Sequence, residues 1–174
     1  MIRRCLVAAM TVAAALTISG TASAAAGGLN AQGGLKFHAV LTGEQEVPEV
    51  ESDATARALA IFDSGFTRVH VHIDVRGFLD VVAAHFHCAR PGANGPVAFG
   101  ILNPGPLSSF PDPTRVTLTN GAFTGQDCVD FVGRPVNNIA ALAFAMRDGL
   151  IYLNLHTPTV PSGEIRGQML DRGH

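Results

Sequence analysis

The stretch 85–88, His-Phe-His-Cys, places two imidazoles and a thiol within four positions. Apolar residues 81–82 precede it and the turn-rich run 90–96 follows it, so the pattern predicts a strand that ends in a loop. Residues i and i+2 of a strand point to the same face, which places His85 beside His87. Two imidazoles on one face can bind one transition metal. One His-x-His motif is a weak signal, so a metal site needs a further ligand and a suitable compartment.

The N-terminus predicts a signal peptide. Arg3 and Arg4 precede an uncharged apolar stretch over 6–18, and the small-x-small sequence Ala22-Ser23-Ala24 follows. The apolar stretch is short for a membrane span, which needs about 20 residues, and no second candidate follows. We therefore expect residues 1–24 to be removed, and the product to be secreted or periplasmic with no membrane span.

The exported chain has the length of one domain. We expect a flexible lead-in over 25–34 and a folded domain over 35–171. The sequence has 12 Lys and Arg against 14 Asp and Glu, and loss of Arg3 and Arg4 changes the net charge from −2 to about −4. No basic run is present, which argues against nucleic acid as a partner.

Cleavage would remove Cys5 and leave two cysteines, Cys88 and Cys128. Two cysteines in an exported chain most simply form one disulfide. A pair of thiol ligands is the alternative, which export disfavours. The disulfide would hold the strand that carries His85 and His87.

Short alternating segments and many Gly and Pro residues predict a fold made of strands. Helical spacing, by contrast, relates Ile139, Leu142, Ala143 and Met146. We predict an all-β fold: an antiparallel, Greek-key-like β-sandwich or flattened barrel of about eight strands, with one short α-helix near 136–148. The expected strands span about 35–41, 55–62, 67–75, 81–88, 97–102, 115–119, 121–124, 150–156 and 164–170.

Five motifs lie along the expected strands and loops: Glu46-Val47-Pro48, Ala84-His85-Phe86-His87, Gly95-Pro96-Val97, Tyr152-Leu-Asn-Leu-His-Thr157 and Gly163-Glu-Ile-Arg-Gly-Gln168. Together they resemble the CHRD (chordin-type) domain of bacterial exported proteins. The likeness runs from about Phe37 to Met169 and implies an all-β extracytoplasmic domain. It implies no established reaction and no catalytic residue. One departure is Glu49, where the family often has a second proline.

The family pattern joins His156 to His85 and His87. Tyr152, Asn154 and His156 share one strand face, so the three histidines could form a Zn or Cu site with an open position. The expected partner is thus a metal ion or an unknown extracytoplasmic protein. One alternative is a structural or protein-interaction module without metal, in which the histidines bond to backbone. Another is a copper redox enzyme resembling superoxide dismutase. Hydrolase and phosphate-loop motifs are absent, so we expect a binding protein rather than an enzyme.

Two further sets of polar residues are expected to be structural. Glu46 or Glu164 should pair with Arg166 and tie the Glu-Val-Pro loop to the last strand. His70 and His72 alternate with apolar residues, so they should lie on a solvated strand face.

Overall fold

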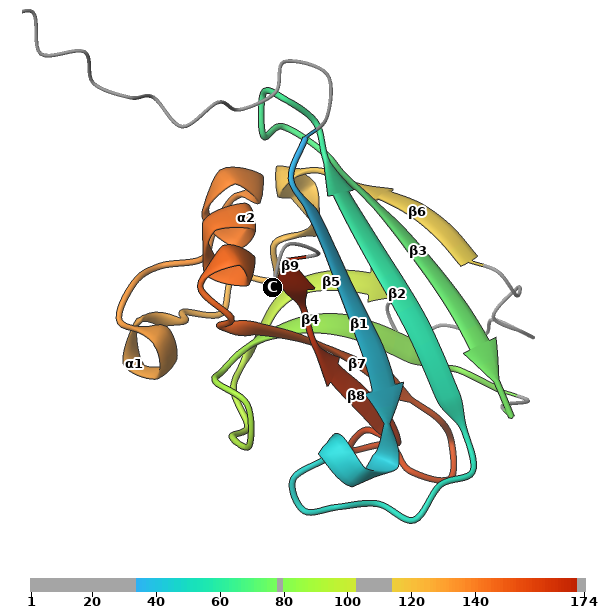
Figure 1. Cartoon of the computed structure of the whole chain (residues 1–174). Coiled ribbons are helices and arrows are strands. Elements are labelled where there is room, and N and C mark those ends of the chain that lie inside the picture. The colour runs from blue at the N-terminus through green and yellow to red at the C-terminus, as the bar shows by residue number, and fades with distance from the viewer. Residues whose placement is uncertain (1–33, 78–79, 103–113, 172–174) are drawn as a thin grey trace, which may run out of the picture.

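The structure is a computed structural model that describes residues 34–77, 80–102 and 114–171 (Figure 1). The predicted signal peptide, and the lead-in apart from Gly34, lie outside these residues. The strands are β1 (Lys36–Thr42), β2 (Thr55–Phe62), β3 (Val69–Arg76), β4 (Ala83–Cys88), β5 (Val97–Leu102), β6 (Thr114–Leu118), β7 (Ile151–His156), β8 (Ile165–Gln168) and β9 (Leu170–Asp171). The helices are α1 (Val129–Val132) and α2 (Ile139–Arg147), with single 3-10 turns η1 (Gly43–Gln45) and η2 (Asn120–Ala122).

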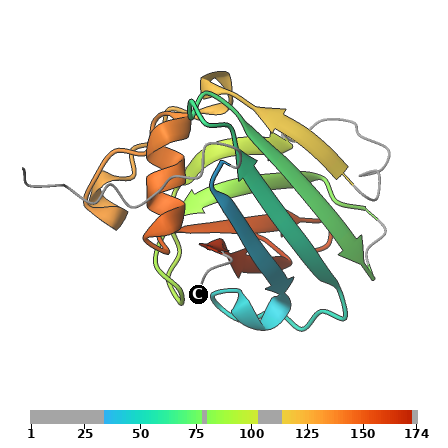
Figure 2. The same cartoon turned by 45° about the horizontal axis from the view of Figure 1, so that its top comes forward.

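All strand pairs are antiparallel, and the strands form one sheet in the order β5-β4-β7-β8-β1-β2-β3-β6, with β9 paired to β1. The sheet curls into a nearly closed barrel, so that β1, β2, β3 and β6 form one wall and β5, β4, β7 and β8 form the other (Figures 1 and 2). The predicted fold class, a flattened antiparallel barrel with one short helix, is confirmed.

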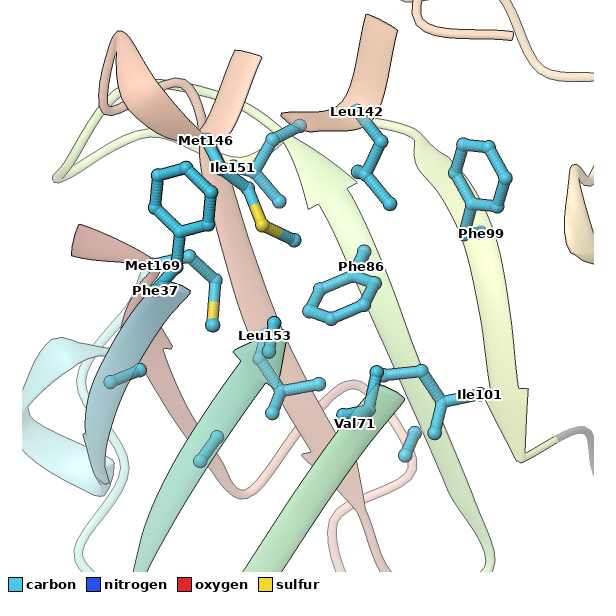
Figure 3. Packing of buried hydrophobic residues seen from close by; sticks show 14 of the residues in the cluster. Phe37, Val71, Phe86, Phe99, Ile101, Leu142, Met146, Ile151, Leu153 and Met169 are labelled. Atoms are coloured by element: carbon cyan, nitrogen blue, oxygen red, sulfur yellow. The ribbon is translucent and has the colours of Figure 1, made fainter. Parts of the chain in front are cut away.

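The two walls enclose the core because strand residues alternate between inside and outside. Along β3, for example, Val69, Val71, Ile73 and Val75 are buried while the residues between them face outward. Figure 3 shows large apolar side chains from both walls meeting between the ribbons. Helix α2 packs its apolar stripe across one end of this core (Figure 2).

Two local features differ from the sequence prediction. Helix α2 begins at Ile139 rather than near residue 136, because the Asn138 side chain caps it by accepting a hydrogen bond from the Ala141 N–H at 2.9 Å. The strand expected over 121–124 is wrong. The Thr119 hydroxyl accepts from the Gly121 N–H and supports the turn η2, which leaves only a single bridge of Phe123 to Phe99 in β5.

Cys88 and Cys128 form the predicted disulfide, with an S–S distance of 2.08 Å and a Cα–Cα distance of 5.8 Å. Both cysteines are fully buried. The bond joins the end of β4 to the residue that precedes α1, 40 positions later. Among the described residues, no helix is long and apolar enough to cross a membrane.

Candidate metal centre

The three histidines lie on one face of two neighbouring strands, β4 and β7. In the register His85 pairs with Asn154 and His87 pairs with Tyr152, while His156 lies one step diagonally from His85. Paired residues of an antiparallel sheet share a face, so all five side chains are on the same side. The alternate residues of both strands point into the core. The barrel wall therefore carries a polar cluster on its outer surface.

The ring nitrogens of this cluster are close enough to share one ion. His85 Nδ1 and His156 Nε2 are 3.1 Å apart, and one nitrogen from each of the three rings lies within 4.8 Å of the other two. Tetrahedral zinc with bonds of about 2.0–2.1 Å requires nitrogens about 3.3 Å apart. The His85–His156 pair is close to this spacing, and the third nitrogen, from His87, lies within 4.8 Å of both.

Backbone carbonyls fix two of the rings. His87 Nδ1 donates to the Gly95 carbonyl at 2.9 Å, and His156 Nδ1 donates to the Pro161 carbonyl at 3.0 Å. A carbonyl only accepts, so each Nδ1 carries the proton and each Nε2 carries a lone pair. Hydrogen bonding of the far nitrogen is how proteins orient metal-binding histidines. Both carbonyls come from loops that fold over the wall, one after β4 and one after β7.

Burial keeps the three rings neutral. It lowers the pKa of His85 to about 4, with smaller contributions from the neighbouring His156 and His87. It also lowers the pKa of His87 to about 4, although the hydrogen bond to Gly95 opposes the shift. The pKa of His156 is lowered for the same reason. Neutral imidazole is the metal-binding form, so at pH 7 all three rings already have the charge state that metal binding requires.

His87 has an additional feature that fits a ligand. Its Nε2 is buried and has no hydrogen-bond partner among the described residues. Tyr152 stacks on the same ring, with centroids 4.8 Å apart and planes 11° apart, and the Arg166 guanidinium lies 4.7 Å from the Tyr152 ring centre. The Arg–Tyr–His stack and the Gly95 carbonyl together hold His87 in one orientation.

Glu46 and Arg166 support the site from the adjacent strand and loop. Glu46 accepts a hydrogen bond from the Asn154 amide at 2.8 Å, and its other oxygen is 3.9 Å from Arg166 Nε. Arg166 also donates to the Gln45 carbonyl and, at 2.9 Å, to the Asn94 side chain. Burial raises the pKa of Glu46 to about 7 because it outweighs the opposing charge of Arg166 at this distance. The Arg166 side chain thus connects the loop after β1 with the loop after β4.

Glu164 has different partners. Its carboxylate accepts from Ser52 at 2.8 Å and from Thr157 at 2.5 Å. Glu46 is therefore the carboxylate near Arg166, and Glu164 instead connects the loop after β7 with the segment before β2. Neither carboxylate is hydrogen-bonded to a histidine of the site.

The loop after β7 depends on Gly163. Its φ of +124° is disfavoured for other residues, and a Cβ at this position would overlap the Asn154 amide. Glycine thus allows the loop to lie directly on the polar cluster, with the Pro161 carbonyl placed against His156.

The structure brings His85, His87 and His156 together, whereas His70 and His72 lie in β3 on the other wall. His70 is exposed and His72 half-buried on the outer face of β3, in agreement with the sequence prediction. Sequence reasoning missed three groups: the ring of Tyr152 as a stacking partner, and the carbonyls of Gly95 and Pro161. Strand alternation placed Tyr152 on the correct face, but backbone carbonyls have no sequence signal.

Comparison with known proteins gives one match. The family model described as CHRD domain matches residues 37–169, nearly the whole of the described chain. The chain matches no curated protein and no solved structure.

Proposed function

The chain belongs to the CHRD domain family, and we propose that it is an extracytoplasmic module that binds Zn(II) or Cu(II) through His85, His87 and His156. The family supports an extracellular type of module, and the buried disulfide fits an oxidising compartment. We further propose that residues 1–24 are a signal peptide. N-terminal sequencing of the exported protein should then begin near Ala25, and a soluble mature product that retains Met1 would contradict this.

The convergence of three neutral imidazoles carries the metal proposal. Two of them have Nδ1 bonded to a backbone carbonyl, which leaves Nε2 as the nitrogen that can bind a metal. An all-imidazole set suits Zn and Cu better than Mg or Ca, which prefer oxygen ligands. Three protein ligands would leave a fourth position for water or a ligand. The role of the protein is then to hold the ion, with His85, the most exposed of the three, toward solvent.

The chain supplies its own matched control for a binding experiment. His85 and His87 in β4 have the same His-x-His spacing as His70 and His72 in β3. We would titrate the metal-free, disulfide-bonded protein with Zn(II) and Cu(II), and quantify bound metal by mass spectrometry after gel filtration. We expect about one ion per chain. H85A/H87A should abolish uptake, and H70A/H72A should retain it.

Two results would overturn the proposal. Equal loss of metal in both double variants would indicate adventitious histidine binding, and absence of uptake by the wild type would leave a structural or protein-interaction module. H156A provides a second test, because it removes the third ligand from a different strand. If the copper-loaded protein also dismutates superoxide and H85A does not, the module is a redox enzyme rather than a binding protein.

A further inference from the structure

The outer face of the other wall, made by β1, β2, β3 and β6, is open to solvent. No described helix or strand covers it in Figures 1 and 2. The register aligns its outward residues in rows across the four strands. One row is Leu170–His38–Leu59–His72–Arg115, and the next rows are Lys36–Ile61–His70–Thr117 and Val40–Arg57–Asp74. We refer to this surface as the β1–β6 face.

This face has the opposite charge to the rest of the chain. Its described residues present four cationic side chains and three imidazoles against one carboxylate, Asp74, while the whole sequence has a net charge of −2. The cations are exposed, and they are spread over all four strands rather than gathered at one point: Lys36, Arg57, Arg76 and Arg115. Neighbouring strands are about 4.8 Å apart, so the charges extend over roughly 15 Å of surface.

The centre of the face is apolar and hollowed. Leu59 and Ile61 are half-buried and form its floor, and two adjoining hollows of about 350 and 310 Å³ meet at Leu59 and His72. Arg57 and Asp74 line the first hollow and Arg115 lines the second. The face is therefore a shallow trough with an aliphatic floor and an arginine in the lining of each hollow.

We infer that the β1–β6 face binds a linear acidic polysaccharide. Anions that repeat along a chain match cations that are spread across four strands, and sugar C–H surfaces match an aliphatic floor. Salt-dependent attraction between a polyanion and several cations gives useful affinity without a deep pocket. This site is on the opposite wall from the three histidines and does not depend on metal.

The shape of the face argues against a membrane as the partner. A bilayer requires apolar side chains that protrude beyond the charged ones. Here Leu59 and Ile61 are half-buried, whereas Arg57 and Arg115 in the same lining are exposed. Among the described apolar residues of this face, only Val40 in β1 and Leu170 in β9 are about half exposed, at 53% and 47%, and both lie at one side of the face.

The test uses alginate, a linear polyuronate, as the probe. We would measure binding of the full exported chain to immobilised alginate at increasing NaCl concentrations, with neutral dextran as a blank. R57E and R115E each reverse a charge in the lining of the trough, and R90E makes the same change at an exposed loop position outside the face. Each trough variant should lower the affinity about tenfold, since one attraction becomes a repulsion, while R90E should change it by about twofold or less.

The controls separate other partners from the polysaccharide. H85A/H87A should bind alginate like the wild type, which shows that the site is independent of the metal centre. The inference is overturned if R90E weakens binding as much as R57E, or if alginate does not bind at low salt. It is also overturned if poly-L-glutamate or vesicles rich in phosphatidylserine bind as tightly as alginate, because the face would then select charge alone or a lipid surface.

Discussion

Replacement of His85 by Asn should remove part of the acid sensitivity of the metal-free protein. In the folded chain burial lowers the pKa of His85 to about 4, against 6.5 in the unfolded chain. Between these values the unfolded chain takes up a proton that the folded chain does not. Acid therefore favours unfolding: the full stability is present above about pH 6.5 and is lost as the pH falls toward 4. Asn keeps a polar side chain on the face but cannot titrate.

The size of the effect follows from the same two pKa values. When the pH falls from 7 to 5, the contribution of His85 should lower the free energy of unfolding by about 1–2 kcal/mol, after allowance for its partial solvent exposure. Glu46 acts in the opposite direction, because burial raises its pKa to about 7 and protonation then favours the folded state. Both proteins contain Glu46, so its contribution cancels when the variant is compared with the wild type.

The assay is urea unfolding with EDTA at pH 8, 7, 6 and 5. The free energy of unfolding of the wild type should fall by about 1–2 kcal/mol more than that of H85N between pH 7 and pH 5. Between pH 8 and pH 7 the difference between the two should change little, by about 0.2 kcal/mol, because His85 is mostly neutral in both states. Parallel pH profiles down to pH 5 would refute the reasoning and show that the ring is not buried against protonation.

Three further predictions concern the structure around the site. C88A/C128A should lower the free energy of unfolding by about 4 kcal/mol, as the chain-entropy treatment gives for a 40-residue separation, and urea titration would measure it. Arg166→Met should lower the free energy of unfolding by about 2–4 kcal/mol, because it removes the cation near Glu46 and the donor to several carbonyls. The zinc stoichiometry should stay unchanged. Loss of metal with a native melting curve would contradict this. Gly163→Ala should destabilise by about 1–3 kcal/mol, because Cβ overlaps the Asn154 amide at a positive φ, and an unchanged melting temperature would argue against that geometry.

Local rules predicted much of the fold. Strict alternation located β2 and β3 closely, because each has one buried and one solvated face. The same parity placed His85 beside His87. The expected strand at 121–124 failed because a Thr119 side chain stabilises a turn there, and such side-chain competition is not visible in the apolar pattern.

The site depends on non-local information that parity does not contain. His156 reaches His85 because β7 lies next to β4 in the sheet. In the sequence, β5, β6 and both helices lie between these two strands. Strand order is set by how the whole core packs, so only the family resemblance had joined the third histidine to the pair. The prediction that an arginine holds the Glu-Val-Pro loop was similarly non-local, and the structure identifies Glu46 as the nearby carboxylate.

The arrangement of protons favours the proposed metal site over three structural histidines. A structural imidazole is stable when both ring nitrogens have partners, and leaving one buried and unpaired costs about 1–3 kcal/mol. His156 meets this condition through Pro161 and His85. His87 does not, because Gly95 occupies Nδ1 while the buried Nε2 has no partner among the described residues. A cation would satisfy that lone pair, and His85 could bind it through Nδ1 once the His85 proton, which now points to His156, has moved to Nε2 of the same ring. The same three rings would then be better satisfied with metal than without it, so zinc at a hundred times its Kd should stabilise the wild type by about 2.7 kcal/mol and leave H87A unaffected.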